Sequence, residues 1–460
     1  MREWQYFEWL FATFTAKYGA FIKILTPKMT VQNSVPSLSN SLKLRLIILV
    51  FLQYAVWGAY LISIGRYLAL AGLGSQIKWF FALNGLVSLF MPALMGIVSD
   101  RFIEAQRTLS VCHLLAGVFM SAAGLYCIHT AQPQFAKLFT LYGLSILFFM
   151  PTVALTNSVS YSAIAGEGAD AVKNFPPIRV FGTVGFICSM LITNWVKAGG
   201  VSMQDSGAQL LFSGLLSIVM CIYALTMPNC PVARGGNART MADAFSVRAF
   251  SLFRERKMAV FFIFSILMGS ALQITNGYAN TFLNSFSSDP SLAGTFAVRN
   301  SNALLSLSQI SETLCFLLIP FFMKRLGIKG VMLMSMVAWV LRFGLFALGT
   351  PDMPGVLLFI LSCILYGIAF DFFNIAGSLY VEQNAGKPLR SSAQGLFMMM
   401  SNGIGATLGV LVAGAIMDKL VFKSADPDWS KAWFIFAGYV LVVTLLFAVF
   451  FKETDSKKEA

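Results

Sequence analysis

Long apolar runs, separated by short polar connections, follow one another along almost the whole chain. A helix that crosses a bilayer needs about 20 mostly apolar residues, and twelve runs reach that length. They lie at 44–68, 76–99, 109–129, 137–162, 174–196, 207–227, 257–284, 294–323, 328–349, 355–382, 390–417 and 432–451. The pattern therefore predicts an all-α membrane protein with twelve transmembrane helices.

The longest polar interruption, PNCPVARGGNARTMADAFSVRAFSLFRERK, separates six runs from six. The start of the chain, MREWQYFEWLFATFTAKYGAFIKIL, is aromatic but too interrupted by charge to span, and it lacks the cleavage site of a signal peptide. It is interpreted as an interfacial helix, as a disordered segment, or as a misassigned start upstream of Met29. The expected parts are an N-terminal extension (1–41), two six-helix halves (42–228 and 257–452), a central loop (229–256) and a tail (453–460).

Composition supports the membrane class, because 57% of the 460 residues are hydrophobic and only 12% are charged. Soluble domains carry about 25% charged residues. The net charge of +13 could suggest nucleic-acid binding. However, with the N-terminus inside, about nineteen Lys and Arg residues fall in the inner segments and about seven in the outer ones. The basic excess thus indicates topology, with both termini and the central loop cytoplasmic, and we expect no nucleic-acid partner.

Enzyme and metal chemistry find little support in the sequence. The seven Cys form no CxxC pair, and the two His, His113 and His129, have no metal-ligand spacing. No Walker A loop is present, and neither is the DDxxD acid pair of membrane-embedded metal-dependent enzymes. We expect no cofactor and no metal, and a membrane-embedded enzyme is the weaker alternative.

Polar side chains stand at helical spacing inside several of the runs. Residues three, four and seven apart share a helix face. The residues concerned are Arg179, Thr183, Phe186, Gln273, Asn276, Gln309, Glu312, Tyr366, Phe370, Asp371 and Asn374. Amides suit the edge of a heterocyclic base, aromatic rings suit stacking, and Gln309 and Glu312 could bridge vicinal hydroxyls. This set favours a neutral ligand that combines a flat ring with a sugar.

Several of these residues also have a structural interpretation. Gln273 could bond a neighbouring helix, Phe186 could pack in the core, and we expect Arg342 to be structural. The depth of Arg179 stays open, since its helix starts either at Pro176 or earlier. Glu312 and Asp371 differ, because an acid at bilayer depth costs several kcal/mol and is a functional hypothesis by default.

A loop between the second and third runs, GIVSDRFIEAQR, is similar to the gating loop of major facilitators. Its matching residues are Gly96, Asp100, Arg101 and Arg107. Glu104 and Ala105 depart from the usual pattern, which leaves the strength of the cytoplasmic latch open. Together with the six-plus-six arrangement, this loop suggests the major facilitator fold, in which two halves face a midplane site.

The polar stretches themselves resemble the nucleoside:proton symporter family of bacterial major facilitators. The segments that carry the resemblance are FLQYAVWGAYL, FMPALMGIVSD, NFPPIRVFGTVGFI, MAVFFIFSILMGSALQITN, LSQISETL, YGIAFDFFNIAGS and SSAQGLFMMMSNGIG. The resemblance implies proton-coupled uptake of purine and pyrimidine nucleosides across the bacterial inner membrane. It implies base contacts from Arg179, Thr183, Phe186, Gln273 and Asn276, and ribose contacts from Gln309, Glu312, Tyr366 and Phe370.

We expect Asp371 to be the proton-coupling carboxylate, or to share that role with Glu312, because burial disfavours the ionised form of an acid. The alternatives are a transporter for a sugar or a drug and a non-transporting sensor on the same fold. The sequence leaves open which nucleosides are preferred and whether sodium replaces the proton. A monomer in the lipid bilayer is the default expectation.

Overall fold

The computed structural model describes residues 38–230, 232, 247–386 and 389–452. The expected tail lies wholly outside the described residues, the expected N-terminal extension lies outside them except for residues 38–41, and much of the expected central loop lies outside them too.

Within the described residues the chain is helical apart from a two-stranded antiparallel ribbon, β1 (Lys197–Ala198) with β2 (Val201–Ser202). The longer helices are α2 (Asn40–Gly58), α4 (Ile77–Ser88), α5 (Met91–Arg101), α6 (Ala105–His129), α7 (Phe135–Gly166), α8 (Ala171–Trp195), α9 (Ala208–Ala224), α11 (Arg256–Ser285), α13 (Ser301–Phe316), α14 (Ile319–Leu348), α15 (Val356–Asn384), α17 (Ala406–Met417) and α18 (Trp429–Phe450). The shorter helices are α3 (Ile64–Leu70), α12 (Phe296–Arg299), α16 (Arg390–Met398), the 3₁₀ turns η1 (Gly74–Gln76), η2 (Met203–Asp205), η3 (Val247–Arg254) and η4 (Phe286–Ser288), and the π-helical segments η6 (Met399–Gly405) and η7 (Asp418–Phe422). Helices predominate because a helix satisfies its own backbone polar groups in lipid.

Ten helical stretches of the described chain are long and apolar enough to cross a membrane. The remaining two expected spans are shorter or broken. The run 207–227 contains the 17-residue α9. The run 294–323 is divided into α12, α13 and the start of α14, which is itself interrupted at Gly327 with a φ of 67°. The break after α12 falls at the polar Asn300, whereas the break after α13 falls at Leu317 and Leu318, which hydropathy joins to the helices on either side.

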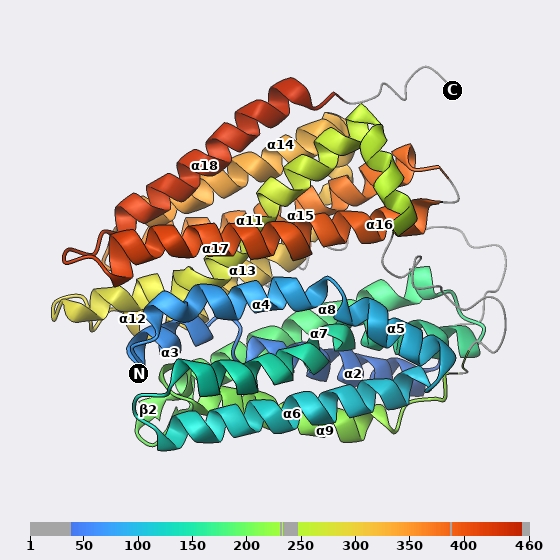
Figure 1. Cartoon of the computed structure of the whole chain (residues 1–460), viewed down its shortest axis with the longest axis horizontal. Helices are drawn as coiled ribbons and strands as arrows, with labels where there is room; N and C mark the ends of the chain where they lie inside the picture. The colour runs from blue at the N-terminus through green and yellow to red at the C-terminus, as the bar shows by residue number, and fades with distance from the viewer. Residues whose placement is uncertain (1–37, 231, 233–246, 387–388, 453–460) are drawn as a thin grey trace.

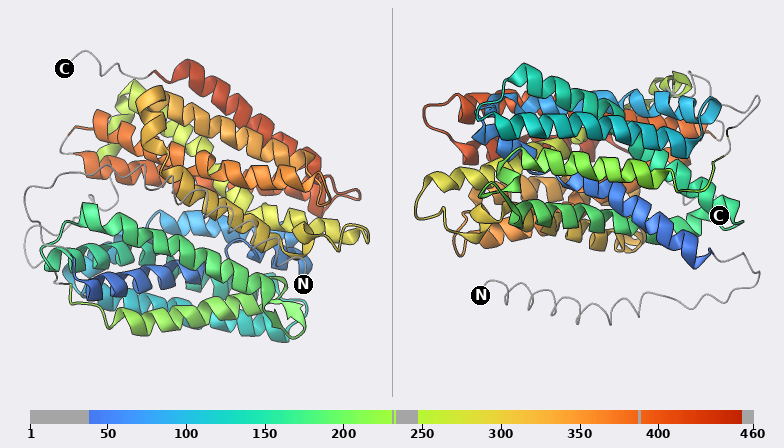
Figure 2. Two further views of the ribbon diagram at one scale, coloured as in Figure 1. Left: turned by 180° about the vertical axis from the view of Figure 1, so that it is seen from behind. Right: turned by 90° about the horizontal axis from the view of Figure 1, so that it is seen from below.

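The helices form two groups, α2–α9 in the lower part of Figure 1 and α11–α18 in the upper part. The view from behind shows the same division (Figure 2). Between the groups, α3 packs against α11, α4 against α17 and α8 against α13. These three contacts join segments far apart in sequence, and they bring α8, α13 and α11 to the boundary between the groups.

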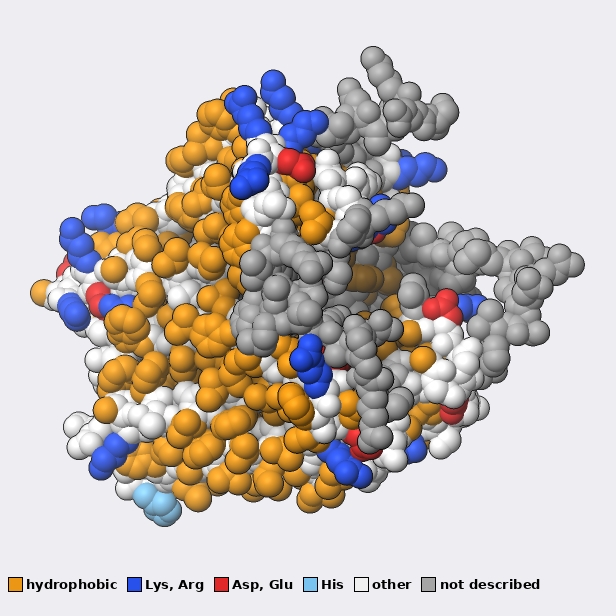
Figure 3. All heavy atoms as spheres, turned by 45° about the vertical axis from the view of Figure 1, so that its right-hand side comes forward, with side chains coloured by type: hydrophobic (Ala, Val, Ile, Leu, Met, Phe, Trp, Pro, Cys, Tyr) orange, Lys and Arg blue, Asp and Glu red, His pale blue; other side chains and the backbone are white. Residues whose placement is uncertain are grey.

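The outside of the molecule is apolar over its middle, with charged side chains nearer its edges (Figure 3). Exposed hydrophobic side chains follow the outer faces of α6 and α18, for example Val111 and Val118 on α6 and Leu445 and Val449 on α18. Apolar surface of this extent is a liability in water but suits contact with lipid chains. The fold therefore buries its polar side chains inward and turns an apolar face to the bilayer.

Helices α2 and α8 cross with their backbones in close contact. A Cβ atom at Gly58 would overlap the backbone of Phe186, and one at Gly185 would overlap the backbone of Phe51. Small residues allow membrane helices to approach in this way. This crossing fixes the relative placement of α2 and α8, which carry side chains of the candidate site described below.

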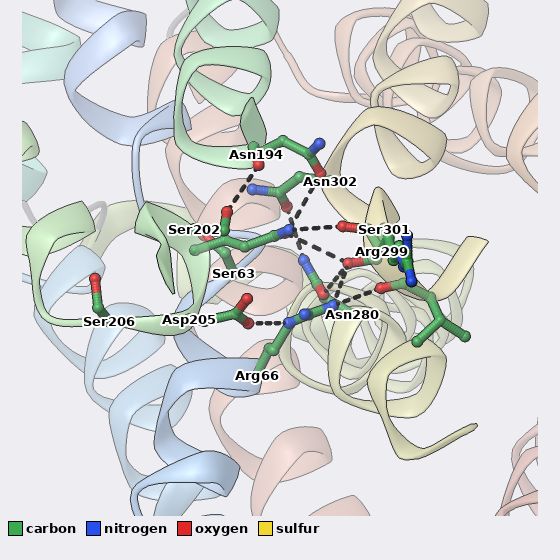
Figure 4. A network of polar contacts seen from close by, with 12 residues as sticks. Ser63, Arg66, Asn194, Ser202, Asp205, Ser206, Asn280, Arg299, Ser301 and Asn302 are labelled. Carbon is green, nitrogen blue, oxygen red and sulfur yellow. Dashed lines mark hydrogen bonds and ion pairs between the residues drawn. The ribbon is translucent and has the colours of Figure 1, made fainter. Parts of the chain in front are cut away.

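A polar network closes one end of the boundary between the two groups (Figure 4). The Arg66 Nε of α3 lies 2.5 Å from the Asp205 Oδ1 of η2. Its Nη1 donates to the Val298 carbonyl and to the Ser301 Oγ, both at 2.9 Å. Because Arg66 is 5% exposed, this cross-link is shielded from water and stronger than a surface ion pair.

Further contacts extend this closure. Asn194 Nδ2 of α8 donates to Asn300 Oδ1 at 2.8 Å, and Asn302 Nδ2 of α13 donates to Thr193 Oγ1 at 3.1 Å. A second ion pair joins Lys78 Nζ on α4 to Asp418 on η7 at 2.5 Å. One ion pair, the hydrogen bonds of Arg66 and an amide cluster therefore hold the groups together at the end where α3 and α12 lie.

Candidate ligand site between the two helix groups

Helix α8 carries the first three candidate residues. It begins at Ala171 and includes Pro176 and Pro177. The helix therefore starts before Pro176, which was the earlier of the two start positions that the sequence left open. Arg179 thus lies about 12 Å along the helix axis from its start, at 1.5 Å per residue. Its guanidinium stands 3.9 Å from the ring centre of Tyr54 on α2. This stacking arrangement holds the cation against an aromatic face instead of releasing it to the helix end.

Two acids from the other helix group interact with this arginine. Glu312 lies on α13 and Asp371 on α15, and both interact electrostatically with Arg179 and with each other. None of the ion pairs of the described chain joins them. One cation and two half-buried carboxyl groups therefore face each other across the boundary without direct contact.

An aromatic pair on α15 lies beside these charges. The rings of Tyr366 and Phe370 are stacked, with centres 5.9 Å apart and planes 11° from parallel. Trp339 of α14 meets Tyr366 edge-on at 6.0 Å. Tyr366 also bonds the side chain of Gln309 and interacts electrostatically with Glu312. The ring orientation is thus fixed from two sides, as a stacking surface requires.

A small hollow brings several candidates together. Its lining includes Asn276, Gln309 and Tyr366, together with Ser308 and Arg342. Gln273, one turn away on α11, is half-buried, and its Oε1 has no hydrogen-bond partner among the described residues. A buried acceptor without a partner costs about 1–3 kcal/mol. The Gln273 Oε1 is therefore available to a ligand and is not consumed by a helix–helix bond of the described chain.

Other candidates are less directly involved. Phe186 is 7% exposed and belongs to the hydrophobic core, as its structural interpretation suggests. Thr183 is half-buried on α8. The four gating-loop residues lie on α5 and at the start of α6, where Arg107 Nε pairs with Glu104 Oε2 at 3.1 Å. Gly96 has open space where a Cβ would stand, so no close helix approach demands a glycine there.

Three residues that the sequence did not single out for a site contribute to it. Tyr54 holds Arg179, Trp339 supports Tyr366, and Arg342 lines the hollow. An arginine inside an apolar run was a usable signal for Arg342. Tyr54 and Trp339 carried no such signal, because aromatic residues are frequent throughout this chain.

A second cavity continues along the same helices from Phe370. Its lining includes Leu272, Trp339, Phe370, Asn374 and Asn402. The Asn374 Oδ1 has no hydrogen-bond partner in the described chain. No group of three or more His, Cys, Asp or Glu side chains with metal-binding geometry occurs among the residues that the structure describes. The site is therefore built from amides, aromatic rings and four charged groups, Arg179, Glu312, Arg342 and Asp371.

Comparisons with known proteins agree with this picture. The family model described as "Nucleoside H+ symporter" matches residues 40–456. The xanthosine permease of Escherichia coli (strain K12) is 43% identical over 417 residues, which cover 90% of this chain and 96% of the permease. The nucleoside permease NupG of the same organism is 42% identical over 414 residues, with the same coverage of both chains.

Solved structures give the same result. A crystal structure of the nucleoside transporter NupG superimposes with a TM-score of 0.82 at 41% identity, covering 90% of this chain and 100% of that one. An auto-inhibited peptide transporter of the POT family gives 0.64 at 12% identity over 91% of this chain and 99% of that one, a likeness of fold alone.

Proposed function

Since this chain belongs to the nucleoside H+ symporter family, we propose that it takes up nucleosides together with protons across the cytoplasmic membrane by alternating access. Membership of this family makes it a transporter and not an enzyme. The observation that carries the proposal is the set of one cation and two acids, Arg179, Glu312 and Asp371, which interact across the two helix groups beside unsatisfied amides.

The topology that fits this function has twelve transmembrane helices in two halves, 42–228 and 257–452, joined by the loop 229–256. Counting α2 with α3, α4 with α5, α12 with α13, and α16 to η7 as single spans gives six in each half. Positive charge concentrates in the segments that would then face inward. Both termini lie in the cytoplasm, and the protein is a multi-pass monomer of the bacterial inner membrane.

In this topology the end closed by Lys78–Asp418 and by the hydrogen bonds of Arg66 to Val298 and Ser301 faces outward. The structure then corresponds to a state closed to the outside. The loop that contains Gly96, Asp100, Arg101 and Arg107 lies on the cytoplasmic side and serves as the gate there. Alternating access requires these outer contacts to break while the inner side closes.

Nucleosides of both purine and pyrimidine type bind between the halves. The base contacts Arg179, Thr183, Phe186, Gln273 and Asn276, and the ribose contacts Gln309, Glu312, Tyr366 and Phe370. Support comes from the stacked pair Tyr366–Phe370, which matches a flat ligand, and from the amide acceptor of Gln273 that no described residue occupies.

Asp371 carries the coupled proton, alone or with Glu312. Its carboxyl group interacts electrostatically with Glu312 on α13 and with Arg179 on α8. A proton on Asp371 removes one of two neighbouring negative charges, so loading and release change the electrostatic balance of the closed site. Inward proton movement supplies about 2.3 kcal/mol per 100 mV of membrane potential. This free energy drives accumulation of the nucleoside.

The decisive experiment follows external pH in a weakly buffered suspension of de-energised cells when nucleoside is added. Wild type should alkalinise the medium, because each nucleoside carries a proton inward. Asp371→Asn should bind nucleoside but lose both the pH rise and uphill accumulation. Nucleoside uptake by wild type without a pH change would leave a facilitator or a sodium-coupled carrier, and undiminished accumulation by Asp371→Asn would remove Asp371 from the proton path.

A further inference from the structure

Arg342 is a fully buried cation inside a transmembrane helix. It lies on α14 with 1% of its surface exposed. No ion pair of the described chain includes it. Removing a charge from water costs several kcal/mol unless a partner compensates. The partners that it does have are therefore informative.

Its known contacts account for only part of the guanidinium. Nη1 donates to the Ser362 carbonyl at 2.6 Å and reaches the Ser308 Oγ at 3.5 Å, and the guanidinium also bonds the Cys363 side chain. The guanidinium carbon lies 4.8 Å from the ring centre of Tyr366 and 5.2 Å from that of Phe346. The Nε is buried, and no described residue accepts its hydrogen. Buried donors normally have an acceptor, so this one lacks an expected partner.

The hollow beside Arg342 is lined by several polar side chains as well as by apolar ones. An amide from each of Asn276 and Gln309, the Ser308 hydroxyl, the Tyr366 ring and Arg342 all border it. It has room for a group about the size of a single water molecule. A purine or pyrimidine ring is much too large to enter, whereas one hydroxyl group fits. The chemistry and the size therefore point to the same kind of group.

We propose that Arg342 is a further ligand-binding residue, whose Nε–H donates to one ribose hydroxyl that enters this hollow. A hydroxyl accepts and donates at once, so it can accept from Arg342 and donate to an amide oxygen of Asn276 or Gln309. Tyr366, stacked on Phe370 and held by Arg342, then forms the wall beside the sugar. This inference rests on the proposed function and adds the residue that selects for a sugar hydroxyl.

The test is direct binding to the purified full-length protein. The ligands are the nucleoside among uridine, adenosine, guanosine and xanthosine that wild type binds most tightly, and its 2′-, 3′- and 5′-deoxy analogues. Arg342→Gln should weaken binding of the parent nucleoside roughly tenfold or more, because a hydrogen bond from a charged donor is lost. One deoxy analogue should bind wild type and Arg342→Gln about equally, within roughly a factor of two, since that hydroxyl is already missing.

Two further variants separate this role from a structural one. Arg342→Lys keeps the charge without the Nε, so it should show the same selective loss; wild-type affinity in this variant would overturn the assignment of Nε. Arg325→Gln is the matched control, because Arg325 lies on α14 before its interruption at Gly327, over the Phe321 ring, and is exposed. It should leave all affinities unchanged.

If Arg342→Gln lost the same factor of affinity for the parent nucleoside and for all three analogues, Arg342 would only support the fold. If Arg342→Gln lost no affinity for the parent nucleoside, the inference would also be overturned. Failure of wild type to bind any nucleoside would instead refute the proposed function, and this inference with it. Binding by wild type thus tests the proposed function, and the difference between parent and deoxy analogues in Arg342→Gln tests the role of Arg342.

Discussion

At the boundary between the two helix groups, some side chains are held in place by other protein side chains, and others have polar atoms that remain free to bond a ligand. Tyr54 holds Arg179, and Trp339 with Gln309 holds Tyr366. By contrast, the oxygens of Gln273 and Asn374 have no partner in the described chain. Buried polar atoms without partners are rare in proteins. Asn374 lines a cavity together with Phe370, and Gln273 lies one turn from Asn276 of the small hollow, so a ligand between the helix groups would satisfy both oxygens.

Glu312 is expected to contribute to binding. In the proposed site its carboxylate accepts a hydrogen bond from the ribose, and hydrogen bonds to charged groups contribute about 1.5–3 kcal/mol. Glu312→Gln should therefore weaken nucleoside affinity by roughly ten- to a hundredfold. Equilibrium binding of radiolabelled nucleoside to purified protein measures this.

The matched control is Glu382→Gln, since Glu382 pairs with Arg390 at 2.8 Å at the exposed end of α15. It should bind as wild type does. An unchanged affinity in Glu312→Gln would argue against the ribose contact and leave Glu312 with a role in proton coupling alone.

At the scale of the helix, close approach and irregularity both have physical causes. The run 44–68 ends its first helix at Gly58, where α2 meets the backbone of α8. The run 390–417 contains the π-helical segment η6, and Ser401 and Asn402 within it line the cavity beside Phe370. π-helical turns often occur at functional sites, because they redirect side chains and backbone groups. A hydropathy profile detects neither the close approach at Gly58 nor the π-helical segment, since it averages the polarity of side chains over a window.

The crossing of α2 with α8 should be intolerant of a methyl group. Gly185→Ala places a Cβ against the backbone of Phe51, which cannot move as a side chain can. Overpacking of this kind costs about 1–3 kcal/mol. We expect a lower thermal unfolding temperature in detergent and weaker nucleoside binding, because Arg179 and Tyr54 lie on the two helices that are forced apart.

Gly438→Ala on α18 is the control, since no atom lies within 4 Å of the position of its added Cβ. Alanine there should be neutral or stabilising by up to about 1 kcal/mol. Equal thermal stability of the two variants would contradict the close crossing.

At the scale of the whole molecule, the polar contacts between the two helix groups determine which end of their boundary is closed. The ion pair Lys78–Asp418 joins the two helix groups, and so do the hydrogen bonds from Arg66 to the Val298 carbonyl and the Ser301 Oγ, while the ion pair Arg66–Asp205 holds Arg66 in place from within the first group. Breaking a buried ion pair costs about 3–5 kcal/mol when one charge is left behind. Such contacts can bias a two-state equilibrium without touching the ligand.

Arg66→Gln should shift the protein towards a state open at this end. It removes the ion pair with Asp205 and weakens the bonds to the Val298 carbonyl and Ser301. Spin labels at Lys197 and Ser288, in a background without the native cysteines, should report a new component of longer distance in double electron–electron resonance.

Lys137→Gln is the control for this prediction, because Lys137 is exposed on α7 and the structure assigns it no ion pair among the described residues. Its distance distribution should match that of the parent. An unaltered distribution in Arg66→Gln would mean that the remaining contacts, including Lys78–Asp418, suffice to keep this end closed.

The sequence by itself determined the membrane class, most helix positions and the polar residues inside the helices, because run length and charge are local properties of the chain. Only the tertiary structure decided that α8 starts before Pro176, that Tyr54 stacks on Arg179, and that Arg342 borders a hollow with Asn276 and Gln309. These contacts depend on how each helix is rotated about its axis and on which neighbour it meets. Packing between helices sets both, whereas helical periodicity within one segment shows only which residues share a face and not which neighbour that face meets.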